Sequence, residues 1–247
     1  MDIARRSEIV TVVLGHLEIT SLHPYHNVHH TKQVIVRFIT FAQEVVPSLT
    51  EEDMDVGIMA ALFHDYGHCG QTIRQTCPNY VPRRDLSNEE YAAECAALWL
   101  KDDFNEEQLK KLQGLILATS FGQNNPAFQF HRTYEPETHC ERVLALADIG
   151  GFYDGFKPWM EESLRVLQEA DTSAIPADFA SWQKNRCGFL SYIEGKLKEM
   201  ESNFKSRGYL ELLCRLQDIL ASMEKRAEEF KEQFETVRAR RLADLQS

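Results

Sequence analysis

The sequence predicts an all-α fold, organised as a single compact helical domain. Apolar residues recur at the three- and four-residue spacing of amphipathic helices along nearly the whole chain. The eight prolines fall between these periodic segments rather than inside them, as expected of a residue that ends helices. A chain of 247 residues can bury one large core without a second domain, and this one shows no convincing strand pair.

Each predicted helix is a periodic segment placed with respect to these prolines. In order, the helices are expected at residues 3–20 ahead of Pro24, 28–46 between Pro24 and Pro47, 51–66 after Pro47, 86–102 after Pro82, 106–121 ahead of Pro126, 139–156 after Pro136, 158–170 from Pro158, 177–203 after Pro176, and 209–243. Residues 70–85 and 122–138 carry turn residues and little periodicity, so we expect them to be irregular.

The last predicted helix, about 209–243, is long and amphipathic. Its apolar stripe alternates steps of three and four residues along Leu213, Leu216, Leu220, Met223, Ala227, Phe230, Phe234 and Val237. Phenylalanines in successive stripe positions fit packing onto a globular body as well as a dimer seam. We favour intramolecular packing, and a homodimer remains the alternative.

Composition limits the partners and the location. The formal net charge of −11 argues against capture of a nucleic acid polymer or an anionic membrane. The N-terminus lacks the apolar core of a signal peptide, and no run reaches the roughly 18 apolar residues of a spanning helix, which predicts a cytoplasmic protein. Six cysteines without a C-x-x-C pair predict free thiols.

Two histidine-rich stretches suggest metal chemistry. "YHNVHH" places His26 and His30 four residues apart, and "HDYGHCG" repeats this spacing with His64 and His68, next to Asp65. On a helix, residues four apart share a face, so we expect each pair to converge on one point. Imidazoles combined with carboxylates suit borderline divalent metals such as zinc, iron, manganese or nickel.

A third stretch, "RVLALADIGG", supplies a carboxylate in apolar surroundings. Asp148 is the one charge between Val143 and two glycines. A carboxylate is costly in such a place unless it is paired, so Asp148 is expected to face a cation.

These residues resemble the HD-domain metal-dependent phosphohydrolases, in which a histidine, a His-Asp pair and a distant Asp lie on helices. "YHNVHH", "HDYGHCG" and "LALAD" further resemble the catalytic domain of the class I 3′,5′-cyclic nucleotide phosphodiesterases. Less specific likeness extends to "SNEEYAAE", "RCGFLSYI" and "LQDILASMEKRAEEF". The resemblance therefore covers most of the chain, from about residue 22 to 235, and implies one catalytic domain over residues 1–247.

The resemblance implies roles for individual residues. His30, His64, Asp65 and Asp148 would bind the first of two divalent ions (zinc, manganese, iron or magnesium), and Asp65 would bridge to the second. A hydroxide between the ions would attack phosphorus, and His26 would protonate the leaving oxygen of a small phosphoester, expected to be a nucleotide. His68 would hydrogen-bond the metal-bound water or the phosphate, and Glu94 would lie behind the metal ligands. Tyr25, Asn27, Arg186 and Phe189 would contact substrate.

The sequence departs from the family pattern at several positions. Arg186 stands where the family has an invariant glutamine, while Phe189 keeps the aromatic clamp of the base. A guanidinium only donates hydrogen bonds, which predicts preference for guanine over adenine, unless Arg186 binds a second phosphate or a carboxylate or Gln183 takes over the reading role. The histidine pair that the family has shortly after the glutamate is missing after Glu94. Where the family has Thr-Asp-Met, the chain has Thr119, Ser120 and Phe121, so a carboxylate is lost at Ser120.

Three other functions remain possible from the sequence. Metal ligands alone do not separate a diesterase from an HD-type nucleotide 5′-phosphatase. An HD-type di-iron oxygenase would need further histidines, such as His68, His131 or His139. A degenerate protein that binds a nucleotide without hydrolysing it would lose part of the ligand set, whereas all four predicted ligands are present here.

Overall fold

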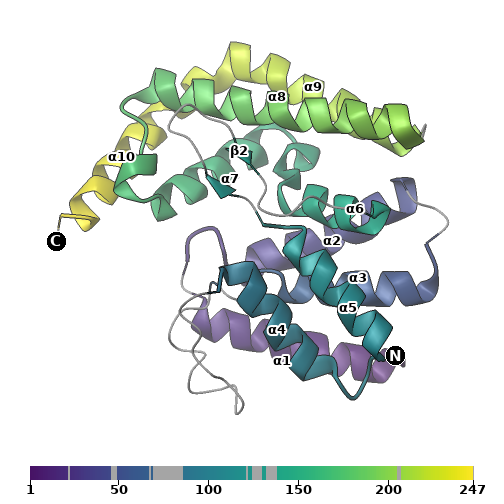
Figure 1. Ribbon diagram of the computed structural model, residues 1–247. Coiled ribbons are helices and arrows are strands. Elements are labelled where there is room, and N and C mark those ends of the chain that lie inside the picture. The colour runs from purple at the N-terminus through teal and green to yellow at the C-terminus, as the bar shows by residue number, and fades with distance from the viewer. Residues whose placement is uncertain are drawn as a thin grey trace. The chain divides into compact units, whose positions relative to one another are not determined.

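The computed structural model confirms the all-α prediction (Figure 1). It describes residues 1–21, 23–45, 49–66, 68, 86–120, 122–123, 130–131, 138–204 and 207–246. Within these ranges the exception to helix is one pair of two-residue strands, β1 (Gly122–Gln123) and β2 (Phe130–His131), which run antiparallel. The predicted irregular segment 70–85 lies outside the described residues, as does most of 122–138.

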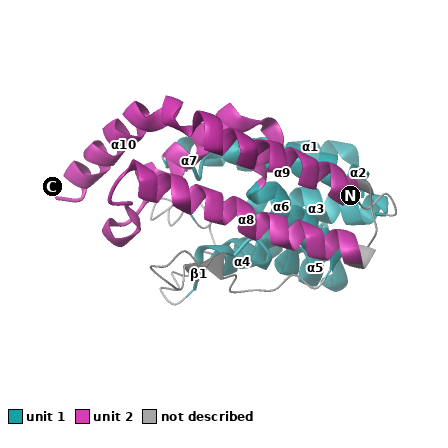
Figure 2. Ribbon diagram, turned by 90° about the horizontal axis from the view of Figure 1, so that it is seen from above, with its two compact units in different colours: residues 1–121, 132–149 teal, residues 122–131, 150–247 magenta. Residues whose placement is uncertain are grey.

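The helices form two compact units, coloured separately in Figure 2. Unit 1 comprises residues 1–121 and 132–149, and unit 2 comprises residues 122–131 and 150–247. Both units are helical, and the assignment of the whole chain to one domain stays a prediction.

Unit 1 is a bundle in which central helices pack on one another. Its helices are α1 (Ile3–Thr20), α2 (Val28–Val45), α3 (Glu51–Phe63), α4 (Asn88–Leu100), α5 (Glu106–Leu117) and α6 (His139–Asp148). Helix α2 packs against both α3 and α6, and fully buried Phe38 and Phe63 belong to the core. Reciprocal capping boxes start α3, α4, α5 and α6, so that their first backbone N–H groups are satisfied locally.

The predicted helix 139–156 is wrong as a single element. Helix α6 ends at Asp148, the 3₁₀ turn η2 (Gly150–Asp154) follows, and α7 (Phe156–Glu169) begins only after Gly155. Gly155 has φ +108°, which strains any residue with a Cβ. At Gly151 an added Cβ would stand against the carboxylate of buried Glu162, so this side chain would have to move if another residue replaced the glycine.

Unit 2 contains the remaining helices. They are α7, the short η3 (Thr172–Ala174), α8 (Phe179–Phe204), α9 (Arg207–Arg226), the 3₁₀ turn η4 (Ala227–Phe230) and α10 (Lys231–Asp244). The predicted helix 209–243 is therefore interrupted at η4. Of the predicted stripe, Leu216, Met223, Ala227, Phe230 and Phe234 are buried within the chain, which supports intramolecular packing, while the homodimer stays a prediction.

Two further expectations can be compared with the described residues. Cys95, Cys140, Cys187 and Cys214 are free thiols, as predicted, while Cys69 and Cys77 lie outside the described ranges. None of the helices in those ranges combines the length and the apolar character needed to cross a bilayer.

Candidate metal centre

Helix ends in unit 1 carry the predicted ligands. His30 lies in the first turn of α2, because Asn27 caps this helix: its side-chain oxygen accepts from the backbone N–H of His29 at 2.9 Å and of His30 at 3.2 Å. The Asn27 amide nitrogen donates to the carbonyl oxygens of His23 and Pro24 at 3.0 and 2.8 Å. This cap holds the first turn of α2, from which the side chain of His30 projects. Contact of Asn27 with substrate stays a prediction.

The other three ligands come from the C-terminal ends of two helices. His64 and Asp65 follow directly after α3, and Asp148 is the last residue of α6. A helix C-terminus carries partial negative charge from its free carbonyl groups, which favours a cation beside it. The Tyr25 hydroxyl lies 3.5 Å from the carbonyl oxygen of Asp148, and the Tyr25 ring lies 4.3 Å from that of His30.

The expectation that each histidine pair shares a helix face is wrong. Helix α2 begins at Val28, so His26 precedes it, and α3 ends at Phe63, so His64 and His68 follow it. Both pairs belong to helix ends, where the backbone turns and directs the side chains. The four-residue spacing therefore does not describe how these histidines are placed, and the helix ends do.

The structure nevertheless brings the four predicted ligands together. His30 Nε2 lies 3.0 Å from Asp148 Oδ1 and 3.4 Å from Asp65 Oδ2. His64 Nε2 lies 3.2 Å from Asp65 Oδ2 and 3.4 Å from both Asp148 Oδ1 and His30 Nε2. Bonds of about 2.1 Å to one ion would separate neighbouring ligand atoms by about 3.0 Å in an octahedron and about 3.4 Å in a tetrahedron. These five separations, 3.0 to 3.4 Å, are those expected of atoms that bind one ion.

Hydrogen bonding prepares His64 to be a ligand. Its Nδ1 lies 2.8 Å from the carbonyl oxygen of Ala61, which can only accept, so Nδ1 carries the proton. In the neutral ring Nε2 then presents its lone pair to the cluster, the usual arrangement of a metal-binding histidine with an outer hydrogen-bond partner. Asp65 Oδ2 is buried without a hydrogen bond of good geometry. These atoms fit a divalent cation.

The charges of the cluster shift its titration. Burial opposes the charged form of His64, but the charge of Asp65 and the hydrogen bond to Asp148 outweigh it and hold the His64 pKa well above its ordinary value. Burial likewise opposes ionisation of the two carboxyls, yet the adjacent imidazoles hold the pKa of both Asp65 and Asp148 well below the usual range. The two carboxylates are therefore ionised and require a proton or a metal beside them.

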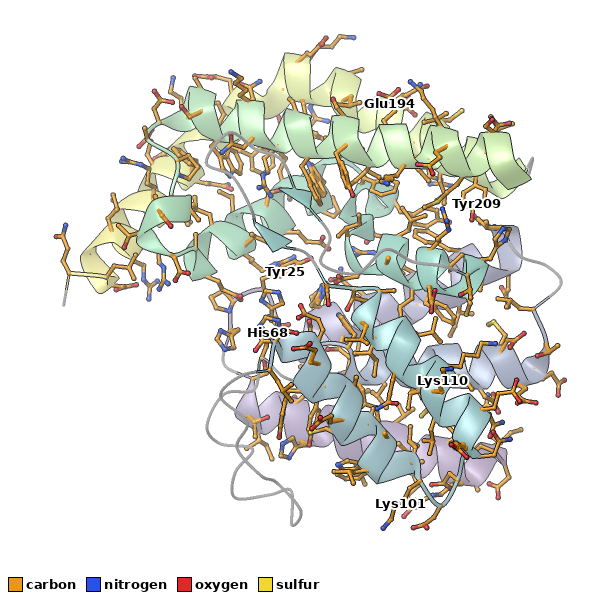
Figure 3. The ribbon with its side chains drawn as sticks, viewed as in Figure 1. Tyr25, His68, Lys101, Lys110, Glu194 and Tyr209 are labelled. Atoms are coloured by element: carbon orange, nitrogen blue, oxygen red, sulfur yellow. The ribbon has the colours of Figure 1, made fainter. Side chains whose placement is uncertain are left out.

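A second group of side chains adjoins the first through Asp65. The ligand atoms of His26, Asp65 and His68 all lie within 4.8 Å of one another. The rings of His26 and His68 are stacked, with centroids 3.9 Å apart and planes within 2°. Figure 3 labels Tyr25 and His68, whose rings and that of His26 form one aromatic patch, since the Tyr25 ring also meets His26 edge-on at 4.9 Å.

Two neighbours of His68 were not predicted. The amide nitrogen of Asn88, in the first turn of α4, lies 3.2 Å from His68 Nδ1, and the exposed ring of His23 meets His68 edge-on at 6.4 Å. The serine before Asn88 marks a helix start in the sequence, but no sequence signal indicates that this helix start lies beside His68.

Other predicted residues lie elsewhere in the chain. Glu94 is half-buried on α4 in unit 1, and its role behind the ligands stays a prediction. Arg186 and Phe189 belong to α8 in unit 2, where Phe189 stacks on Trp159 at 5.9 Å and the guanidinium of Arg186 lies 5.8 Å from the Phe189 ring. The Gln183 amide donates to the carbonyl oxygen of Met223 at 3.1 Å.

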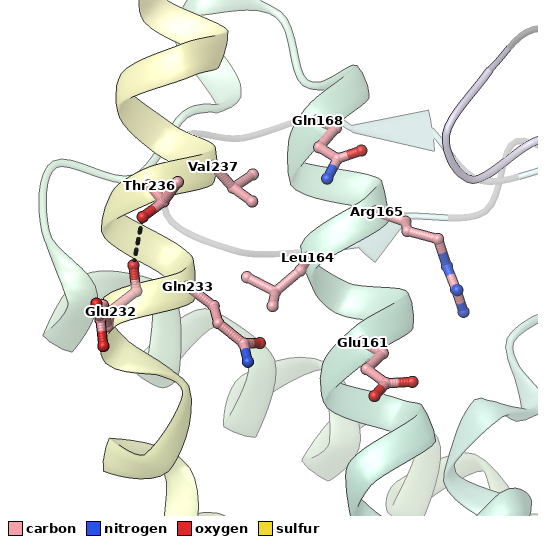
Figure 4. A pocket seen from close by; sticks show the side chains of 8 residues that line it. All are labelled: Glu161, Leu164, Arg165, Gln168, Glu232, Gln233, Thr236 and Val237. Carbon is pink, nitrogen blue, oxygen red and sulfur yellow. Dashed lines mark hydrogen bonds between the residues drawn. The ribbon is translucent and has the colours of Figure 1, made fainter.

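Unit 2 also contains a cavity of about 450 Å³ between α7 and α10 (Figure 4). Leu164 and Val237 supply its apolar wall, and the polar groups around it include Arg165 and Gln168. None of the predicted catalytic, metal-binding or substrate-binding residues lines it, and Thr236 at its edge only bonds back to the Glu232 carbonyl at 2.9 Å.

Comparison with known proteins identifies the segment that carries this centre. Residues 28–149 match the family model described as the HD domain. Members of this family generally are metal-dependent hydrolases and bind divalent metals. The matched segment contains His30, His64, Asp65, His68 and Asp148. No curated protein and no solved structure matches the chain.

Proposed function

We propose, on the premise that residues 28–149 belong to the HD domain family, that the protein is a metal-dependent 3′,5′-cyclic nucleotide phosphodiesterase. The family supports a metal-dependent hydrolase in general. The cyclic diester is the finer part of the proposal, and it rests on the residues that surround the centre.

The choice of a diester rests on the Tyr25-His26-Asn27 motif. One observation carries the proposed acid: His26 lies beside the cluster of His30, His64, Asp65 and Asp148 but outside it. The His26 ring is 6.2 Å from that of His30, nearly perpendicular to it, and its flat stack on His68 fixes its orientation. Cleavage of a cyclic diester releases a ribose oxygen that must be protonated as it leaves, and imidazole is the most common side chain for such a transfer. His26 is placed to hold that proton.

The other residues divide the remaining tasks. His30, His64, Asp65 and Asp148 would hold the first ion, and Asp65 is shared with the neighbouring group. Bound divalent ions would polarise a phosphoryl oxygen and lower the pKa of water toward neutrality. Tyr25 packs on both His26 and His30 and so holds the acid and the ligand at a fixed separation.

Base preference belongs to the same proposal. Gln183 already donates its amide hydrogen to the Met223 carbonyl, which supports Arg186 rather than Gln183 as the residue that reads the base. Because a guanidinium only donates, Arg186 would match O6 and N7 of guanine. We expect Arg186→Gln to shift the ratio of cyclic GMP to cyclic AMP turnover toward adenine, and an unchanged ratio would contradict this assignment.

The test of the proposed function is a hydrolysis screen with the full chain. Cyclic mononucleotides, cyclic dinucleotides and nucleoside 5′-monophosphates are incubated with manganese, after chelation, and after restoration of the metal. We expect cyclic mononucleotides to yield monophosphates only when metal is present. Release of inorganic phosphate from 5′-monophosphates alone would favour a nucleotidase, and binding without turnover in every condition would contradict hydrolysis.

A second candidate, a di-iron oxygenase, is favoured by the extra histidines beside Asp65. Its further ligands have little support, because His139 lies nine residues before Asp148 on the same helix, about 14 Å away along the axis, and the side chain of His131 lies outside the described residues. Oxygen consumption by the iron-loaded protein, without phosphoester hydrolysis, would establish this candidate instead.

A further inference from the structure

The two oxygens of Asp65 face different groups of nitrogen atoms. Oδ2 faces His64 Nε2 at 3.2 Å and His30 Nε2 at 3.4 Å. Oδ1 faces His68 Nε2 at 3.9 Å. Two ligand atoms bound at about 2.1 Å to one ion can be up to about 4.2 Å apart, so Oδ1 and His68 Nε2 can hold an ion between them where they stand.

Local backbone structure holds this pair of atoms together. The backbone N–H of His68 donates to the carbonyl oxygen of Asp65 at 3.0 Å, which closes a 3₁₀ turn just beyond α3. In such a turn, side chains three residues apart lie on the same side. Asp65 and His68 therefore present their ligand atoms from one short, hydrogen-bonded piece of chain, independently of distant packing.

The stack between His26 and His68 means that only one of the two rings can bind such an ion. The lone pair of an imidazole nitrogen lies in the plane of its ring. Two rings whose planes are parallel within 2°, with centroids 3.9 Å apart, cannot both direct an in-plane lone pair at one point. We take His68 as the ligand because its Nε2 lies 3.9 Å from Asp65 Oδ1 and because His26 is the acid in the proposed function.

Asn88 adjoins His68 from a helix start fixed by the Ser87 capping box. Its amide nitrogen lies 3.2 Å from His68 Nδ1 and 3.3 Å from Nε2. Because the two distances are nearly equal, the amide lies off the plane of the ring and leaves the in-plane lone pair of Nε2 unblocked.

We infer that His68 is the protein nitrogen ligand of a second divalent ion, which it holds together with Oδ1 of Asp65. His26 is then left as the proton donor, kept from coordination by the stack. This inference rests on the proposed metal-dependent hydrolase, but it predicts metal content rather than activity. Direct ligation also differs from the role that the family resemblance implies, in which His68 only contacts bound water or the phosphate.

The test counts metal ions in the full chain. Manganese is titrated calorimetrically, and bound metal is measured by elemental analysis, for the wild type, His68→Ala, His26→Phe and the exposed control His29→Ala. We expect two equivalents for the wild type, His26→Phe and His29→Ala. In His68→Ala the second equivalent should weaken about tenfold or more while the first is kept. Two equivalents of unchanged affinity in His68→Ala, or loss of the second in His26→Phe as well, would overturn the inference.

A second variant tests ligation directly and does not depend on a loss. His68→Cys places a thiolate at the site, and Co²⁺ bound to it should give a thiolate-to-cobalt charge-transfer absorption that is absent from the wild type and from His29→Cys. In a folded, cobalt-loaded His68→Cys protein this band would establish position 68 as a ligand. If the metal counts agree with the inference but no phosphoester is hydrolysed, only the proposed function is refuted. If phosphoesters are hydrolysed but His68→Ala keeps both ions with unchanged affinity, only the inference is refuted.

Discussion

Gly57→Ala should disturb the metal centre from inside the helical core. Gly57 lies in α3 against the ring of Phe38 in α2, and an added Cβ would stand 2.5 Å from Phe38 Cε1 and closer still to Cζ. Carbon atoms pack at about 3.5 to 4.0 Å, so the ring or the helices must move by about 1 Å or more. The Phe38 ring is fully buried and has no open side into which it can turn freely.

The displacement should reach the ligands, because α2 carries His30 and the end of α3 carries His64. These residues lie about 12 and 11 Å along their helices from the point of contact. Overpacking costs about 1 to 3 kcal/mol, of which the higher helix propensity of alanine returns up to about 1 kcal/mol. The 2.5 Å contact places the cost in the upper part of this range, about 2 to 3 kcal/mol, so the net loss should be about 1 to 2 kcal/mol and lower Tm by about 2 to 8 °C. Manganese binding should weaken as well, because metal sites tolerate shifts of only about 0.2 Å.

Thermal unfolding in chelator and manganese calorimetry measure both effects. Gly15→Ala in α1 is the matched control, since its Cβ meets nothing within 4 Å, and it should be neutral or slightly stabilising without changing metal affinity. Replacing Phe38 with leucine in the Gly57→Ala background should recover part of both losses, a non-additive result expected of residues in contact. Wild-type Tm and metal affinity in Gly57→Ala would refute the reasoning.

The remaining predictions concern the ligands, the acid, pH and the C-terminal stripe. Asp148→Asn should abolish binding of the first ion and turnover, measured by calorimetry and by the hydrolysis screen. His26→Phe should lower turnover by about a hundredfold or more with both ions still bound, and loss of metal in this variant would contradict its role as acid. Because the His64 pKa is raised, its proton competes with metal. The Tm increase caused by manganese should therefore grow from pH 6 to pH 8, with affinity changing up to about tenfold per pH unit for each proton released, and a pH-independent increase would be inconsistent with this. Phe234→Ala should destabilise unit 2 by about 3 to 5 kcal/mol without changing the molar mass measured by light scattering, whereas a change of mass would support the dimer seam.

The sign of the pH effect in the metal-free protein follows from the same pKa shifts. A raised His64 pKa stabilises the fold below its unfolded pKa, near 6.5, and this contribution is lost as pH rises through the higher folded value. The lowered pKa values of Asp65 and Asp148 stabilise the fold above about pH 4 and are lost in acid. At alkaline pH the carboxylates therefore lose their imidazolium partner, and a bound cation would take its place.

Helical periodicity predicted most elements to within a turn, and it failed where backbone conformation rather than side-chain pattern decides. The apolar pattern continues across residues 149–155, so it could not reveal that Gly155 adopts a left-handed conformation or that Gly151 meets a carboxylate. The same limit applies at η4, where the stripe stays in phase through Ala227 and Phe230 although the helix changes to 3₁₀ geometry. At both η2 and η4 the apolar side chains stay on the buried side of the chain. The spacing of apolar residues in the sequence therefore cannot reveal that the α-helix is interrupted there.

At the site, too, the sequence shows which residues are present but not how the backbone directs their side chains. Two histidine pairs with equal spacing looked equivalent in the sequence, yet each lies across a helix end, and the two ends differ. His26 precedes α2 in a turn closed by Asn27, while His68 follows α3 in a 3₁₀ turn closed on the carbonyl of Asp65. The second turn directs its histidine toward Asp65 Oδ1. In the proposed assignment, the difference between an acid and a ligand would arise from which side of a helix terminus each histidine occupies, and spacing alone carries no information about that side.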